Sequence, residues 1–216
     1  MRVPLYIYVL SNIVVLPVIV GIIKYKKLDS IYRCFLYHLG LAFFWEVSSP
    51  ILPRNIEYVN LENYLFTGSI VPFSYFSLMS WAMMKNVNKK TIMLTIIIIM
   101  LACIELSIYG LEKIRVTYSA PLLDIISVIL GLNAFFVIYS KKYSVMERRS
   151  LFMLVIPLIV INSFSTILYI TLALYYSPSN QEFFIKLFNV SHVLNALAFI
   201  CYSLSFILKP PKQVYL

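Results

Sequence analysis

Seven long apolar runs alternate with short polar connections along the whole chain. They cover residues 3–23, 34–52, 64–84, 91–110, 120–140, 151–175 and 183–208. Each run is near the roughly 20 residues that a helix needs to cross a bilayer. The pattern therefore predicts an all-α polytopic membrane protein, in which residues 1–216 form a single bundle of seven transmembrane helices.

The basic residues fall mainly on one side of this predicted bundle. Thirteen Lys and Arg residues lie in the first, third and fifth connections and in the segment after the last run, whereas five lie on the other side: Arg2, Arg54, Lys113, Arg115 and Lys186. Short connections rich in Lys and Arg stay on the cytoplasmic side of a membrane. We therefore expect the N-terminus outside and the C-terminus in the cytoplasm.

Composition excludes several other classes of protein. Hydrophobic residues make up 61% of the chain and charged residues 12%, whereas a soluble domain is about 45–50% apolar. The formal charge of +9 does not indicate nucleic-acid binding, because the basic residues punctuate apolar runs instead of forming a polar groove. The bilayer is therefore the expected partner, and the basic connections could also contact a cytoplasmic or membrane protein.

A few polar residues interrupt the apolar runs. Glu46 stands about twelve residues into the second run, which places it roughly 18 Å deep in a helix. An ionised carboxylate that faced lipid at this depth would cost about 2.5 kcal/mol or more. We therefore expect Glu46 to face protein or water.

Other polar positions approach the same depth or lie nearer the outer face. Three of them, Asn189, His192 and Asn195, recur every three residues in the last run, loosely on one helical face. Asparagines in membrane helices often serve only as hydrogen-bonding contacts between helices. The predicted ligand or proton site consists of Glu46, His192, Asn195, Asn12, Asn162, Glu105 and Asp124. We expect Glu46, His192 and Asn195 to share a water-accessible cavity, with Glu105 or Asp124 near its mouth.

Motifs for catalysis, metal binding and cofactor binding are not visible. The sequence has no HExxH and no GxSxG pattern, and no lysine stands in the middle of a run where retinal could attach. Cys34, Cys103 and Cys201 lie in separate apolar runs without CxxC spacing. We expect no enzyme activity, no cofactor and no metal.

Three prolines predict kinks in the helices. Pro17, Pro72 and Pro157 lie inside runs, where a missing N–H and a steric clash should kink each helix.

Tyrosines gather near both ends of the runs, as in the aromatic belts of membrane proteins. Tyr25 and Tyr32 are expected in the belt at the inner boundary.

Several motifs together resemble small seven-helix inner-membrane proteins of bacteria with no assigned activity. The resemblance rests on Ser11-Asn12 in the first run, the connection Tyr25-Lys26-Lys27-Leu28, Glu46, and the closing segment SHVLNALAFICYSLSF from Ser191 to Phe206. It implies a location in the bacterial inner membrane. It implies neither an activity nor site residues.

Two functional hypotheses follow from these patterns. The first is a sensor or receptor-like subunit, in which a polar pocket in the outer half binds a small molecule and a separate cytoplasmic partner carries the signal onward. The second is a small proton- or cation-coupled transporter that uses Glu46, since an acid inside the membrane without a fixed counter-ion is typical of ion paths. An assembly or scaffold role and an intramembrane enzyme remain as alternatives.

Overall fold

The computed structural model describes residues 5–48, 119–141, 143–175 and 177–209, together with isolated positions 97, 100, 104, 107 and 108. Every element in these ranges is helical. The elements are α1 (Leu5–Asn12), α2 (Val15–Lys24), the 3₁₀ turn η1 (Tyr25–Lys27), α3 (Ser30–Ser48), α7 (Ser119–Ser140), α8 (Val145–Tyr175), the 3₁₀ turn η3 (Pro178–Asn180) and α9 (Gln181–Leu208). The predicted all-α class is confirmed.

Two of the described helices are long and apolar enough to cross a membrane, by length and composition. They cover Val145–Leu172 in α8 and Gln181–Leu208 in α9, and shorter apolar helical stretches cover Ile31–Phe44 and Asp124–Ser140. The predicted run 64–84 and nearly all of 91–110 lie outside the described residues. The full count of seven spans and their orientation therefore stay predictions.

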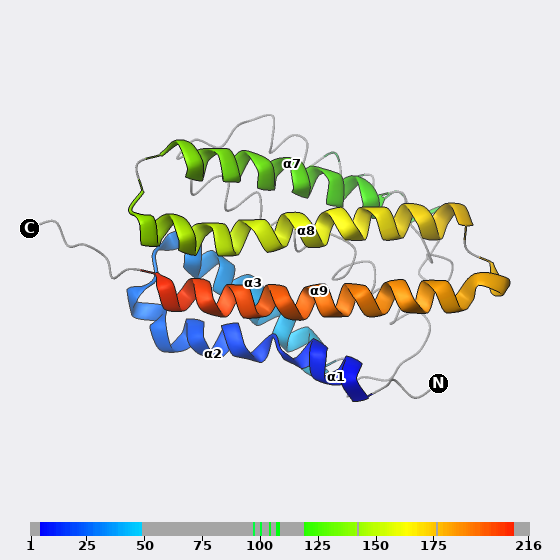
Figure 1. Ribbon diagram of the computed structural model, residues 1–216, viewed down its shortest axis with the longest axis horizontal. Helices are drawn as coiled ribbons and strands as arrows, with labels where there is room; N and C mark the ends of the chain where they lie inside the picture. Colours follow the sequence, from blue (N-terminus) through cyan, green and yellow to red (C-terminus); the bar gives the residue numbers. More distant parts are fainter. Residues whose placement is uncertain are drawn as a thin grey trace, which may run out of the picture.

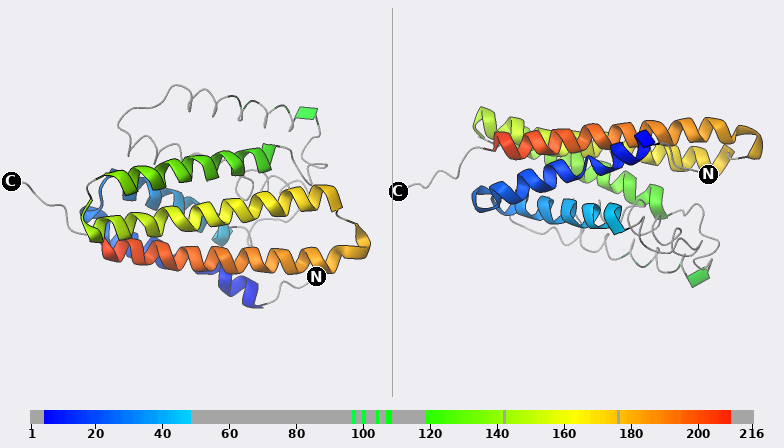
Figure 2. Two further views of the ribbon diagram at one scale, coloured as in Figure 1. Left: turned by 45° about the horizontal axis from the view of Figure 1, so that its top comes forward. Right: turned by 90° about the horizontal axis from the view of Figure 1, so that it is seen from below.

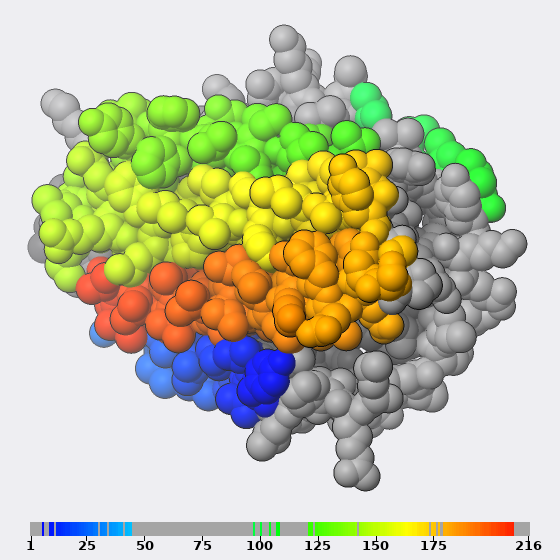
Figure 3. Space-filling view, turned by 45° about the vertical axis from the view of Figure 1, so that its right-hand side comes forward, coloured from blue at the N-terminus to red at the C-terminus, as the bar shows by residue number. Residues whose placement is uncertain are grey.

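The helices lie side by side along the long axis of the molecule (Figure 1). α8 packs between α7 and α9, and α9 packs in turn against α1 and α2. α3 passes behind α9 and packs against α2, as Figures 1 and 2 show together. In the space-filling view, α7, α8 and α9 form adjacent strips of one face (Figure 3). We call the end that carries Lys24, Lys27, Lys141, Arg148 and Lys209 the basic end.

Pro17 interrupts the first predicted run. α1 ends at Asn12, a turn follows at Ile13 and Val14, and α2 begins at Val15. Proline has no N–H to bond the carbonyl four residues earlier, and its ring clashes with that carbonyl. The break beside Pro17 confirms the predicted distortion. Pro157 lies inside α8, which continues from Val145 to Tyr175 as one helix, so the kink expected there stays a prediction.

Side-chain caps set where two helices begin. Ser144 Oγ accepts a hydrogen bond from the Glu147 backbone N–H at 3.2 Å, and the Glu147 carboxylate accepts one from the Ser144 N–H at 3.4 Å. This reciprocal pair is a capping box at the start of α8. Asp29 Oδ1 accepts from the Tyr32 N–H at 3.3 Å at the start of α3. Each cap satisfies a backbone donor that the first helical turn leaves unpaired.

The apolar core lies where α2, α3, α8 and α9 meet. Phe35 is fully buried, with its ring centroid 4.6 Å from that of Tyr202 and 6.0 Å from that of Phe206. Gly21 lets α2 approach α3 closely, because a Cβ at this position would overlap the Leu36 side chain. Ring packing and this close approach therefore fix α3 against its neighbours.

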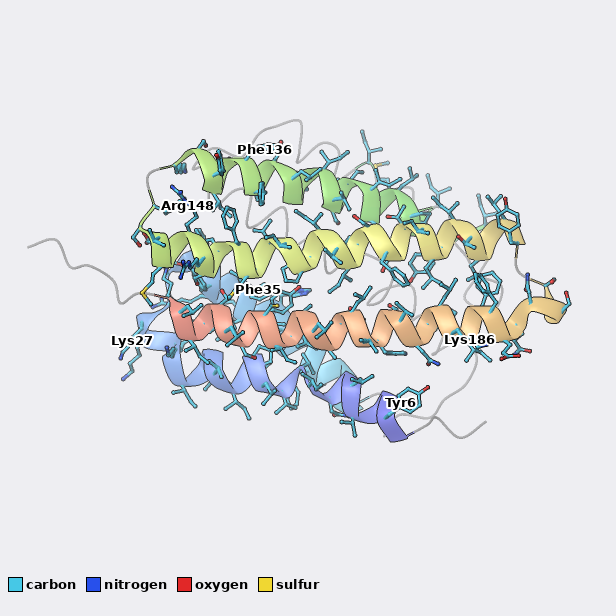
Figure 4. All side chains as sticks on the ribbon, in the orientation of Figure 1. Tyr6, Lys27, Phe35, Phe136, Arg148 and Lys186 are labelled. Atoms are coloured by element: carbon cyan, nitrogen blue, oxygen red, sulfur yellow. The ribbon has the colours of Figure 1, made fainter. Side chains whose placement is uncertain are left out.

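Exposed apolar side chains form regular stripes on two helices. Those of α7 are Leu122, Ile125, Ile129, Leu132, Phe136 and Tyr139, and those of α9 are Val190, Val193, Leu197, Ile200, Leu204 and Ile207. The alternating spacing of three and four residues keeps each set on one helical face. Figure 4 shows Phe136 on the side of α7 that faces away from α8. The buried set includes polar residues such as Asp124, Ser127, Ser150, Asn162 and Ser205. Apolar side chains thus cover the exposed faces of these two helices, and a few polar groups are buried in the described part of the bundle.

Candidate polar site and the basic end

Asp124 and Ser127 form the most deeply buried polar pair on α7. Asp124 is 2% exposed and Ser127 is 0% exposed. A spacing of three residues places both on one face of the helix. In the part of the chain that the structure describes, neither Asp124 Oδ2 nor Ser127 Oγ has a hydrogen-bond partner. Both groups can therefore still accept or donate hydrogen bonds.

Asn162 of α8 lies at the same level of the bundle. α7 and α8 are antiparallel neighbours joined at the basic end. At about 1.5 Å per residue, Asp124 lies about 24 Å from the last residue of α7, and Asn162 lies about 25 Å from the first residue of α8. Asn162 is 2% exposed, and its Nδ2 donates to the Leu158 carbonyl at 2.7 Å. We call Asp124, Ser127 and Asn162 the polar layer.

The predicted residues of α9 reach a similar level. His192 lies about 24 Å from the end of α9 and Asn195 about 20 Å from it, counted along the helix. Both side chains are half-buried, as is Asn189. Asn12, the last residue of α1, is also half-buried, whereas Asn133 of α7 is exposed.

The structure does not describe the side chains of two acids that belong to the predicted site. Glu46 belongs to the last turns of α3, but its side chain lies outside the described residues, and so does the whole of Glu105. α3 packs directly on α9 through Phe35 and Tyr202. About 24 Å of helix separates Glu46 from the start of α3, a distance comparable to that of His192 from the end of α9. The meeting of Glu46, His192 and Asn195 in one cavity stays a prediction.

A second polar cluster joins three helices at the basic end. The Tyr32 hydroxyl of α3 lies 2.6 Å from Ser150 Oγ of α8, and Ser150 Oγ donates to the Ser205 carbonyl of α9 at 2.8 Å. Ser205 Oγ donates in return to the Ser150 carbonyl at 2.7 Å. All three side chains are fully buried. We call Tyr32, Ser150 and Ser205 the hydroxyl cluster.

Burial and hydrogen bonding correct the assignment of Tyr32 to an interfacial belt. Tyr32 is 0% exposed, so its side chain faces the interior of the bundle and not lipid or water. Burial raises the pKa of the Tyr32 phenol well above its ordinary value, an effect that outweighs the opposing hydrogen bond with Ser150. The hydroxyl therefore stays protonated and can act as the donor to Ser150. The assignment failed because hydropathy does not report which face of a helix packs inward.

An ion pair joins the end of α9 to the start of α3 at the basic end. Lys209, just after α9, pairs with Asp29, just before α3. The Lys209 ammonium also lies 4.2 Å from the centroid of the Tyr32 ring. Cations over an aromatic face are attracted by the ring quadrupole. The side chain of Lys209 is 6% exposed and that of Asp29 is 34% exposed, so the pair is largely shielded from water. It holds the end of α9 to the start of α3.

Of the residues that meet at the basic end, the sequence pattern named Tyr32 only as an interfacial tyrosine and did not predict roles for Asp29, Ser150 and Ser205. Asp29 was a visible signal, since it is an acid within the basic segment from Lys24 to Arg33. In the polar layer, the signal for Ser127 was its position one helical turn after Asp124, on the same face of the helix. Nothing in the sequence marked Ser150 and Ser205, because serines are common in membrane helices and only the packing of α8 on α9 brings these two together.

Within the ranges that the structure covers, no three His, Cys, Asp or Glu side chains gather where they could hold a metal ion. Comparison of the chain with protein-family models, with curated proteins and with solved structures finds no match.

Proposed function

We propose that the chain is an integral membrane protein with seven spans, which acts as a sensor or receptor-like subunit for a small cationic or hydrogen-bond-donating molecule. The observation that carries the proposal is the buried carboxyl of Asp124, with one oxygen unpartnered among the described residues, beside the equally buried Ser127 hydroxyl. A buried polar group without a partner is costly. A ligand that donates hydrogen bonds or carries positive charge would remove this cost.

The apolar stripes of α7 and α9 support insertion in a membrane. Contiguous exposed apolar surface on a soluble monomer rarely exceeds a few hundred Å², whereas here apolar side chains follow nearly the whole length of two helices. Lipid tails match such a surface. The bacterial inner membrane is the location that we propose, in keeping with the resemblance of the sequence motifs.

Helix α8 supplies the link that a sensor needs between ligand and output. Asn162 in the polar layer and Ser150 in the hydroxyl cluster belong to this one helix, about 18 Å apart. A shift of α8 that accommodates a ligand beside Asp124 would thus move Ser150 against Tyr32 and Ser205. The basic end would pass this movement to a separate partner protein.

The proposed orientation places the basic end in the cytoplasm. We expect a reporter that is active only in the cytoplasm to work when it is fused after Leu216, Asn86 or Tyr143, because thirteen basic residues lie on that side. The same reporter should fail after Asn55 or Asn180. Activities in the opposite pattern would overturn the orientation.

Substitution of Asp124 tests the ligand site. We expect that, among Na⁺, K⁺, Ca²⁺, ammonium and short alkylamines, at least one raises the thermal midpoint of the full chain in detergent. A ligand at a hundred times its Kd stabilises by about 2.7 kcal/mol. The stabilisation should vanish in Asp124→Leu, which lacks the carboxylate, and should persist in Asn133→Leu, where the replaced residue of the same helix is exposed.

Chemical cross-linking in native membranes tests the output half of the proposal. A partner recovered in equal amount with the chain, and lost on addition of the stabilising ligand or gained with it, would support a sensor. Absence of both a partner and a stabilising ligand would refute it.

The buried carboxyl of Asp124 also favours the transporter as a second candidate, because a carboxyl that binds and releases a proton could couple ion movement to a substrate. Reconstituted vesicles that contain a pH-sensitive dye separate the two functions. A transporter would change the pH inside the vesicles in response to an ion or substrate gradient, and Glu46→Gln or Asp124→Asn would abolish this response. A sensor would show no such flux.

A further inference from the structure

A hollow of about 310 Å³ opens at the basic end, away from the polar layer. Its lining comes from α2, η1, the start of α8 and the end of α9: Lys24, Lys27, Leu28, Met146, Phe206, Ile207, Leu208 and Lys209. The volume is roughly ten times the share of one water molecule in the liquid, about 30 Å³. The hollow is thus large enough for a group of several heavy atoms.

Positive charge dominates this hollow. Three lysines line it, and no acidic residue does so among the described residues. Lys209 is paired with Asp29, whereas Lys24 and Lys27 form no ion pair with a carboxylate among the described residues. Lys27 is exposed at the end of η1, and Lys24 is half-buried. An anion is therefore the ligand that the charge favours.

Lys24 also offsets the negative charge of the backbone carbonyls at the end of α9, which would otherwise oppose anion binding. The C-terminal carbonyls of a helix carry partial negative charge, and those of α9 end beside the hollow. The Lys24 ammonium donates to the Ile207 carbonyl at 2.8 Å, and the Lys209 backbone N–H donates to the Ser205 carbonyl at 3.0 Å. An ammonium group has three protons to donate, so Lys24 can bond this carbonyl and an anion together.

The remaining wall is apolar. Leu28 and Phe206 are buried beneath the hollow, whereas Met146 and Ile207 are 52% and 49% exposed at its edge. A free inorganic anion would gain nothing from these side chains. A molecule with an anionic group and an attached hydrocarbon chain would contact both kinds of wall. Basic pockets between membrane helices on the cytoplasmic side bind the headgroups of anionic lipids by such contacts.

We propose that this hollow binds the phosphate of an anionic glycerophospholipid, with Lys24 and Lys27 on the phosphate and with Met146 and Ile207 against the glycerol and the first acyl carbons. The inference rests on the proposed insertion in a membrane and is independent of the ligand at Asp124. It assigns to the basic end a lipid-binding role besides the proposed contact with a partner protein.

Native mass spectrometry of the full chain in dodecyl maltoside tests the proposal, with dioleoylphosphatidylglycerol and dioleoylphosphatidylcholine as probes. We expect the wild type to retain phosphatidylglycerol in preference to phosphatidylcholine. Lys27→Gln should weaken retention of phosphatidylglycerol about fivefold, the effect of losing one lysine near an anionic headgroup.

Lys26→Gln is the matched control. Lys26 is the neighbouring exposed lysine of η1 and does not line the hollow, so the variant has the same net charge as Lys27→Gln and should bind within about twofold of the wild type. Circular dichroism should give equal helix content for both variants, because both side chains are exposed.

Three other results would overturn the proposal in distinguishable ways. Equal weakening by the two variants, or no preference for phosphatidylglycerol, would mean general surface attraction. Release of phosphatidylglycerol by millimolar sodium phosphate would mean a site for the free anion. Retention of neither lipid, together with extraction of the chain in a soluble fraction without detergent, would refute the proposed membrane insertion as well.

Discussion

Replacement of Phe35 by alanine should lower the free energy of unfolding by about 3–5 kcal/mol, the usual cost of truncating a fully buried aromatic side chain. The phenyl ring packs against the rings of Tyr202 and Phe206 of α9, and its removal leaves a cavity at the contact of α3 with α9. Loss of packing, more than transfer from water, sets this cost when the protein is in lipid or detergent.

Phe136→Ala provides the control for this prediction. Phe136 is 64% exposed on α7, so its truncation should change stability by less than about 0.5 kcal/mol. Thermal unfolding of both variants in the same detergent, followed by circular dichroism, measures the difference. Equal midpoints for the two variants would contradict the described packing of α3 on α9.

Replacement of Lys209 by methionine should have the second largest effect, a loss of about 2–3 kcal/mol. Breaking a buried ion pair by removal of one partner costs about 3–5 kcal/mol. The cost is smaller here because the side chain of Asp29 is 34% exposed, so water can solvate the carboxylate that remains. The Tyr32 ring also loses the cation that lies over it.

An exposed ion pair of the same kind supplies the matched control. Lys186 and Glu182 of α9 lie 2.9 Å apart, with their side chains 72% and 82% exposed. Such pairs contribute about 0.3–0.5 kcal/mol. The thermal midpoint of Lys186→Met should therefore be close to that of the wild type, and that of Lys209→Met should be roughly 5–10 °C lower.

The double variant Asp29→Asn with Lys209→Met should recover part of the lost stability, because it leaves no unpaired charge. No recovery would mean that Lys209 acts through packing and not through its charge.

Hydropathy predicted the helices well and their ends less well. The run 183–208 became α9 from Gln181 to Leu208, and the run 120–140 became α7 from Ser119 to Ser140. α8 begins at Val145, six residues before the predicted run, because the Ser144–Glu147 capping box starts the helix within a charged segment. A window that scores only apolar residues cannot include such a polar first turn.

The sequence identified polar candidates for a site but not their arrangement, and the site itself stays a prediction. Asp124, Asn162, His192 and Asn195 were all identified from their positions inside apolar runs, and the helix lengths place them at similar levels. Which of them turn inward depends on how the helices pack. Asn133 and Asp124 share α7, yet Asn133 is exposed and Asp124 is buried, a difference that a single sequence does not reveal.

The contacts at the basic end can form only late in the synthesis of the protein. Asp29 and Lys209 are separated by 180 positions, and Tyr32 and Ser150 by 118. At about 5–20 residues per second, roughly 10–40 s pass between synthesis of Asp29 and synthesis of its partner. During that interval α3 lacks both the ion pair and the contact of Phe35 with α9. The N-terminal helices therefore lack these stabilising contacts until α9 and Lys209 have been synthesised.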